Sequence, residues 1–178
     1  LYPYSKVYLA SVKQQSGSYW NNHFNTIGLV GMHEAALNLG LGGIHTTEGR
    51  LFALETLDFM RQRIAGYQEE AGSLFNLEAT PAEGTTYRFA RLDRSTFPDI
   101  ITSGSEEPYY TNSTHLPVGY TDDLFTALEL QDELQTKYTG GTVFHGFLGE
   151  SVEDPGVLAS LLKRVFSQYR LPYFTITP

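Results

Sequence analysis

Apolar and polar positions alternate along the chain in blocks that predict strands and helices in turn. Short apolar runs bounded by glycine or polar residues predict four strands, at residues 25–31, 73–79, 140–149 and 172–177. Apolar residues three or four positions apart predict six helices, at residues 5–15, 32–40, 47–71, 81–93, 121–135 and 154–170. Strands that alternate with helices favour an α/β fold with mainly parallel strands.

Three of the predicted helices begin with capping signals. Asp154 is followed by a proline at the first helical position, and the helix at 121–135 opens on a threonine and two aspartates. Thr80, Pro81 and Glu83 have the spacing of a capping box, in which the threonine and glutamate side chains bond to backbone N–H groups. These signals predict where each of the three helices begins.

The composition narrows the class of protein. The chain has 178 residues, of which 41% are hydrophobic, and this is enough to build one packed domain. Its formal net charge of −8 disfavours nonspecific binding to nucleic acid or to an anionic membrane surface. No apolar run has the length of a membrane span and no signal-like pattern opens the chain, so we expect a cytoplasmic protein. The absence of cysteine removes thiolate nucleophiles and Cys-ligated zinc from this chain.

In a sheet of parallel strands, ligands bind beyond the carboxyl ends of the strands. The positions that follow the predicted strands are residues 32–34, 78–86 and 149–150. Within the first range we expect Glu34 to be an ordinary exposed helix residue. Glu78 ends an apolar strand, and a carboxylate in a dry pocket there has a raised pKa and exchanges protons. The alternative is that Glu78 faces outward and pairs with an arginine.

The turn after Glu78 is a candidate anion site. Its small residues leave backbone N–H groups open at the start of a helix, where the helix dipole also favours negative charge. The residues of this turn are Thr80, Pro81, Ala82, Glu83, Gly84 and Thr85. Taken alone, Thr80 and Pro81 favour plain helix capping, so the sequence allows a phosphate site here without requiring one.

A second polar segment, PYYTNSTHLPVG at residues 108–119, is dense in hydrogen-bonding groups. Asn112, Ser113 and His115 lie between apolar residues and are candidates to orient a sugar or a phosphate. A surface loop that uses Asn and Ser for its turns is the alternative. The five histidines of the chain show no metal-ligand spacing, and we assign none of them to a metal: His23, His33, His45, His115 and His145.

Four stretches together resemble a known enzyme family. NTIGLVGMHEA, FNLEATPAEGTTYRFARLD, PYYTNSTHLPV and GGTVFHGFLGE occur in the order and approximate spacing of the anaerobic (class III) ribonucleoside-triphosphate reductases, which are glycyl radical enzymes. The resemblance extends over essentially the whole chain. It implies a portion of a ten-stranded α/β barrel that converts ribonucleoside triphosphates to deoxyribonucleoside triphosphates.

The resemblance also implies which parts of the enzyme lie elsewhere. The family uses a glycyl radical near the C-terminus, a cysteine on a loop inside the barrel and a four-cysteine zinc site. None of these is present here, and both ends of the chain look cut. We therefore expect residues 1–178 to be a single segment from the C-terminal part of the catalytic barrel, binding no cofactor itself and inactive alone.

The partners that the resemblance implies are those of the whole reductase. They are the ribonucleoside triphosphate substrate, a radical S-adenosylmethionine activating enzyme, dNTP or ATP effectors and a second copy of the chain in a homodimer. The reductant is formate or a thioredoxin-like protein. A glutamate at the position of Glu78 resembles the subgroup that uses the thioredoxin-like donor.

The resemblance gives the candidate residues roles. It implies that the backbone N–H groups of the turn at 80–85 bind substrate phosphate and that Glu78 transfers protons beside the ribose. Asn112, Ser113 and His115 complete the wall of the substrate pocket.

Two other functions fit parts of the pattern. A glycyl radical lyase of the pyruvate formate-lyase kind shares the barrel, although its site favours arginines and the polar stretches here are rich in Thr, Ser and Asn. The other is a non-catalytic α/β binding module.

Overall fold

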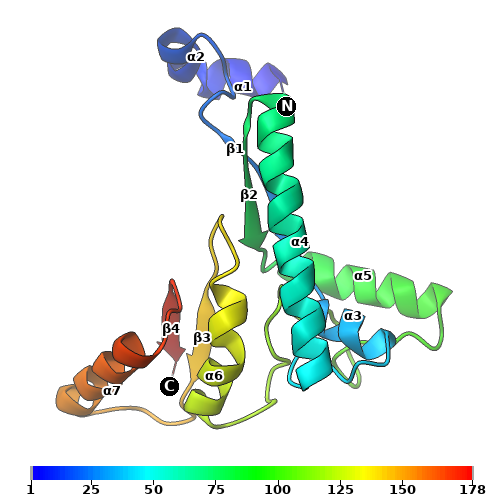
Figure 1. Ribbon diagram of the computed structural model, residues 1–178, viewed down its shortest axis with the longest axis vertical. Helices are drawn as coiled ribbons and strands as arrows, with labels where there is room; N and C mark the ends of the chain where they lie inside the picture. Colours follow the sequence, from blue (N-terminus) through cyan, green and yellow to red (C-terminus); the bar gives the residue numbers. More distant parts are fainter. Residues whose placement is uncertain (1, 178) are drawn as a thin grey trace.

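The computed structural model describes residues 2–177, in which seven helices and four strands alternate (Figure 1). In chain order they are α1 (Tyr2–Tyr8), α2 (Ala10–Ser16), β1 (Phe24–Leu29), α3 (Met32–Asn38), α4 (Thr47–Ala71), β2 (Leu74–Ala79), α5 (Glu83–Thr96), α6 (Leu124–Gln135), β3 (Phe144–Phe147), α7 (Pro155–Gln168) and β4 (Phe174–Thr177). All four predicted strands are confirmed, and α4 has the predicted bounds. The helix predicted at 5–15 is instead two short helices that meet at Leu9.

The strands pair in parallel, as predicted. β1 pairs with β2 from Phe24↔Leu74 to Leu29↔Ala79, and β3 pairs with β4 over four positions. A single parallel bridge between Glu78 and Gly141 connects β2 to the segment that leads into β3. The strands therefore form two two-stranded sheets, β1–β2 and β3–β4, linked by this bridge, and within the described residues β1 and β4 each pair along their length with one strand only.

One face of these strands is covered by helices. α4 packs on β2, and α6 packs on β3 (Figure 1). Leu77 of β2 is fully buried in a cluster with Leu57 of α4, and Phe144 of β3 is buried with Leu128 of α6. Because side chains alternate along a strand, the residues between these point away from the helices. We call this second side the open face and define it by Asn76, Glu78, His145 and Thr175.

Ion pairs fix α6 against α4. Lys137, just after α6, contacts Asp58 at 2.8 Å, and Arg50 contacts Glu133 at 3.2 Å.

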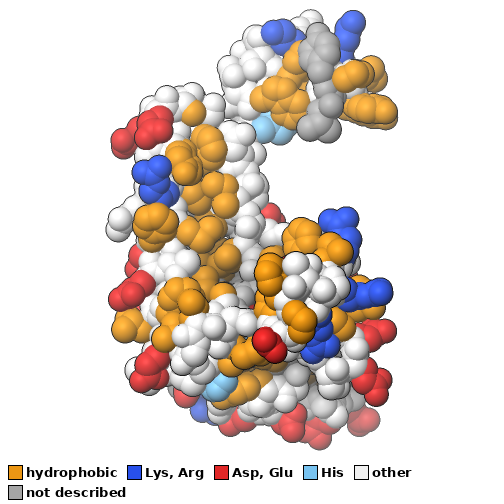
Figure 2. All heavy atoms as spheres, turned by 90° about the vertical axis from the view of Figure 1, so that its right-hand side faces the viewer, with side chains coloured by type: hydrophobic (Ala, Val, Ile, Leu, Met, Phe, Trp, Pro, Cys, Tyr) orange, Lys and Arg blue, Asp and Glu red, His pale blue; other side chains and the backbone are white. Residues whose placement is uncertain are grey.

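Figure 2 shows hydrophobic side chains along the upright column that α4 forms, and Leu51 and Phe59 of α4 are 55% and 62% exposed. Among the described residues, no helix combines the length and apolar character of a membrane span.

Two of the three capping predictions are confirmed. The Asp123 side chain accepts from the N–H of Phe125 at 2.8 Å, and Asp154 accepts from the N–H of Gly156 at 2.7 Å.

The capping-box prediction at Thr80 is wrong. α5 begins at Glu83, its N-cap is Ala82 with φ of 45°, and no side chain caps it. The Thr80 side chain instead lies against Gly28 of the neighbouring strand, where a Cβ would collide with it. β2 ends at Ala79, and the helix begins two residues later than the local signal indicates.

Candidate functional site

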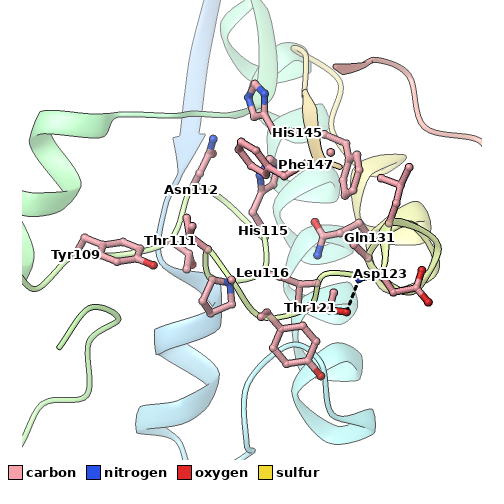
Figure 3. Close-up of a pocket in the computed structure, with 18 residues that line it drawn as sticks. Tyr109, Thr111, Asn112, His115, Leu116, Thr121, Asp123, Gln131, His145 and Phe147 are labelled. Atoms are coloured by element: carbon pink, nitrogen blue, oxygen red, sulfur yellow. Dashed lines mark hydrogen bonds between the residues drawn. The ribbon is translucent and has the colours of Figure 1, made fainter. Parts of the chain in front are cut away.

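A hollow lies between residues 109–121, α6 and β3, and has a volume of about 260 Å³ (Figure 3). We call it the α6–β3 cavity. Its walls contain the predicted site residues Asn112 and His115, together with Gln131 of α6 and His145 of β3. Its apolar walls come from Leu116, Pro117, Val118, Leu124, Ala127, Phe144 and Phe147.

Three polar atoms in the walls of this cavity are buried and have no hydrogen-bond partner within residues 2–177. They are Asn112 Oδ1, His115 Nε2 and Gln131 Nε2. A buried polar group without a partner costs free energy, roughly 1–3 kcal/mol, and native structures avoid it. Three such atoms beside one hollow favour a polar occupant, either water or a polar ligand.

The Gln131 amide is held in one orientation by a buried chain of side chains. Thr142 Oγ donates to Gln135 Oε1, and Gln135 Nε2 donates to Gln131 Oε1 at 2.9 Å. Gln131 and Gln135 are 1% and 0% exposed. Because the Gln131 oxygen is already used, its N–H₂ group is the part of the amide that lacks a partner.

His115 is uncharged at neutral pH. Its pKa is lowered to about 4, mainly by burial and to a smaller extent by nearby His145, while an interaction with the Gln135 side chain offsets part of the shift. The two imidazole rings have their centroids 6.4 Å apart, and His145 Nδ1 lies 2.8 Å from Thr175 Oγ1 of the adjacent strand. A neutral imidazole at the wall presents a hydrogen-bonding nitrogen without a positive charge.

The segment that carries Asn112 and His115 is fixed by Glu34. This carboxylate accepts from the N–H of Thr111 at 3.0 Å, from the Thr111 hydroxyl at 2.9 Å and from the Ser103 hydroxyl. Glu34 is 1% exposed, so the expectation that it is an exposed helix residue is wrong. Its partners come from a loop about seventy residues further along the chain, and a helix pattern contains no information about them.

Backbone pairing holds the same segment at the end of β1. The N–H of Gly31 donates to the Thr111 carbonyl at 2.8 Å, and the N–H of Met32 donates to the Ser113 carbonyl at 3.0 Å. Asn112 forms an antiparallel bridge with Val30. Ser113 is fully buried, has φ of 44° and does not line the cavity, so the structure separates it from Asn112 and His115.

Glu78 lies at the carboxyl end of β2, on the open face, and is partly buried. Leu77 and Ala79, on either side of it, face the helices. Within residues 2–177 the structure shows no ion pair or hydrogen bond of the Glu78 side chain, so the arginine partner of the alternative interpretation is not among these residues. Glu78 does not line the α6–β3 cavity.

The predicted turn leaves two backbone N–H groups open at the start of α5. The first N–H groups of a helix have no partner inside the helix. Those of Thr85 and Thr86 already donate to the Ala82 carbonyl, both at 2.8 Å, whereas Glu83 and Gly84 are exposed. No atom lies within 4 Å of where a Cβ on Gly84 would be. The open part of the turn is therefore narrower than residues 80–85.

The glutamines were missed by the sequence reasoning. Leu124, Leu128, Gln131 and Gln135 follow one another at spacings of four, three and four along α6. This is the spacing of a buried helix stripe, so two glutamines in it were the available signal for a buried polar group.

These features are those of an α/β ligand-binding site at the carboxyl ends of parallel strands. The chain belongs to the anaerobic ribonucleoside-triphosphate reductase family, whose family model matches residues 1–178. This confirms the resemblance seen in the four sequence stretches. It does not support either alternative considered above, the glycyl radical lyase or the non-catalytic α/β binding module.

Named relatives and solved structures agree with this assignment. The anaerobic ribonucleoside-triphosphate reductases of Escherichia coli K12 and Haemophilus influenzae are 29% and 31% identical to this chain, covering 86% and 81% of it. A crystal structure of the Thermotoga maritima anaerobic ribonucleotide reductase with MES in the active site matches 86% of the chain, with a TM-score of 0.70 and 28% identity. The chain spans 22% of each curated relative and 26% of the solved chain.

Proposed function

We propose that this chain is part of the catalytic barrel of an anaerobic ribonucleotide reductase and supplies phosphate and ribose contacts to the substrate. The observation that carries the proposal is the position of Glu78. It is a partly buried carboxylate without a partner among the described residues, on the open face, at the end of a central parallel strand. Open N–H groups at the start of α5 follow it within six residues.

The turn after β2 binds the substrate phosphate through main-chain groups. The N–H groups of Glu83 and Gly84 point out of the start of α5, a helix of 14 residues, where the helix dipole contributes about 0.3–1 kcal/mol per negative charge. Thr80 sets the position of this turn by packing on Gly28. Thr85 contributes its hydroxyl, because its N–H is already bonded.

Glu78 handles protons at the ribose. In this family the glycyl radical supplies the radical chemistry that begins ribose reduction, and the 2′-hydroxyl leaves as water. A carboxylate beside the sugar takes and returns the protons that this reduction requires. We assign this role to Glu78, which fits a reductase whose electrons come from a thioredoxin-like protein.

The radical and zinc groups of the family do not fit residues of this chain. The sequence contains no cysteine, so neither the thiol that acts on ribose nor a four-cysteine zinc site belongs to it. Among residues 2–177 no three His, Asp or Glu side chains cluster as metal ligands do. Both groups therefore belong to other parts of the reductase.

The remaining partners follow from the family. The substrate is a ribonucleoside triphosphate, the activating enzyme is a radical S-adenosylmethionine protein, and the reductase is a cytoplasmic homodimer regulated by dNTP or ATP. A Thermotoga maritima anaerobic ribonucleotide reductase has been solved in complex with dATP and CTP, which supports nucleotide binding in this family.

The test is Glu78→Gln in the full-length reductase. The amide keeps the shape of the side chain but cannot take up a proton, so we expect kcat to fall at least about a hundredfold. Substrate Kd stays within about twofold, because an uncharged side chain of equal size leaves the phosphate contacts in place.

Glu55→Gln is the matched control, since Glu55 is an exposed glutamate on α4 and should leave both constants unchanged. Wild-type kcat in the Glu78 variant would remove this carboxylate from the mechanism.

A further inference from the structure

The α6–β3 cavity has no cationic side chain in its walls. No lysine or arginine lines it. Its one carboxylate, Asp123, is engaged by the N–H groups of Phe125 and Thr126 at the start of α6. A polyanion such as a triphosphate, and a small anion such as formate, both lack a counter-charge here. The charge of the walls therefore selects an uncharged ligand.

The size of the cavity selects a small ligand. Pockets for drug-sized molecules occupy about 300–1,000 Å³, whereas this one has about 260 Å³. A whole nucleotide exceeds that space, and a single flat ring system fits it. The apolar walls from Leu116, Leu124 and Phe144 offer surfaces on which such a ring packs.

The polar atoms of the walls require a ligand with both donors and acceptors. Gln131 Nε2 is a donor, because the chain through Gln135 and Thr142 fixes its amide. Asn112 Oδ1 is an acceptor, and His115 Nε2 is the third unpaired atom. Nucleobases carry donors and acceptors in one plane along their edges, next to apolar ring faces.

We propose that the α6–β3 cavity binds the base of the ribonucleotide substrate, with the Gln131 amide as the group that contacts the base edge. This rests on the proposed function, because it assumes that the chain binds a nucleotide. It assigns the two ends of that nucleotide to different places. The phosphates lie at the start of α5, and the base lies between the 109–121 segment, α6 and β3.

The experiment tests the two ends of the nucleotide separately, with one ligand that carries the base but no phosphate and another that carries only the phosphates. Ribonucleosides and inorganic tripolyphosphate are titrated separately into the full-length reductase, with calorimetry giving each Kd. Gln131→Met removes the amide at nearly constant volume, and Gln62→Met makes the same change at an exposed position on α4. A second cavity variant, Ala127→Leu, fills the space from a position on α6 one helical turn before Gln131 and keeps the glutamine itself in place.

The expected result is selective. Loss of one buried hydrogen bond weakens nucleoside binding by about fivefold in Gln131→Met, and Ala127→Leu weakens it more because the ring no longer fits. Tripolyphosphate binding is unchanged in both variants, and Gln62→Met resembles the wild type for both ligands. Near-ultraviolet circular dichroism checks that the variants keep the native packing.

Other outcomes have definite meanings. Nucleoside binding that is insensitive to both cavity variants overturns the base assignment, and so does a wild-type reductase that binds tripolyphosphate but no nucleoside. Failure of tripolyphosphate to bind the wild type, with nucleoside binding still sensitive to Gln131→Met, overturns the phosphate site alone. The two proposals therefore fail in distinguishable ways.

Discussion

Two replacements of Glu34 test why it holds the 101–116 segment. Leucine cannot accept hydrogen bonds, whereas glutamine can accept them without a charge. Glu34→Leu removes every acceptor and leaves the buried N–H of Thr111 without a partner, together with the Thr111 hydroxyl. One orphaned buried group costs about 1–3 kcal/mol, so the two together destabilise the segment by about 2–6 kcal/mol.

Glu34→Gln keeps the hydrogen bonds. The Gln oxygen accepts from both groups of Thr111, and its N–H₂ group donates to the Ser103 hydroxyl, which reverses its role. Only the extra strength of a charged acceptor is lost, and the neutral side chain is easier to bury. We expect about 1 kcal/mol or less.

The assay is amide hydrogen exchange of residues 101–116, followed by mass spectrometry on the full-length reductase. Since 1.4 kcal/mol corresponds to a factor of ten, Glu34→Leu accelerates exchange roughly thirtyfold or more, and Glu34→Gln less than about tenfold. Equal acceleration in both variants would show that the charge, and not the accepting oxygens, holds the segment. Wild-type exchange in Glu34→Leu would refute the anchoring role itself.

Three further predictions concern packing and protonation. Leu57→Ala, at a fully buried position of α4, should lower the free energy of unfolding by about 2–5 kcal/mol, while Leu51→Ala at a 55% exposed position of the same helix should have little effect in the same denaturant titration. The pKa of His115 is lowered to about 4 in the folded protein, so between pH 4 and 6.5 the unfolded chain binds more protons than the folded one. The contribution of His115 to stability is therefore complete above the unfolded pKa and is lost as the pH falls through that window. His115→Gln should flatten the dependence of the unfolding midpoint on pH in this range. Gly28→Ala should shift the turn before α5 and weaken tripolyphosphate binding, because its Cβ meets the threonine side chain of the next strand, whereas Gly66→Ala has open space around it and should leave that Kd unchanged.

Local signals in the sequence were sufficient for most of the fold. The long stripe of α4 and the aspartate caps of α6 and α7 are properties of a few neighbouring residues, so the pattern predicts them. The same reasoning failed at Thr80, where a contact with Gly28 in another strand overrides a capping box. A contact between residues far apart in the sequence has no local signature.

The sequence also predicted only some residues of the candidate site. Asn112 and His115 were singled out because polar residues were dense in their segment, and both line the cavity. Glu34 was expected to be exposed, because its burial depends on a distant loop. The buried glutamines of α6 were overlooked, because the pattern at 121–135 was used only to predict a helix and where it begins.

The outer strands have a practical consequence. β1 and β4 each pair along their length with one strand within residues 2–177, so the other side of each presents unbonded N–H and C=O groups. Exposed strand edges of this kind recruit further strands from any available source. Expressed by itself, this stretch of polypeptide should self-associate edge to edge, and its solubility should depend strongly on concentration. Binding and exchange measurements are therefore best made with the whole reductase.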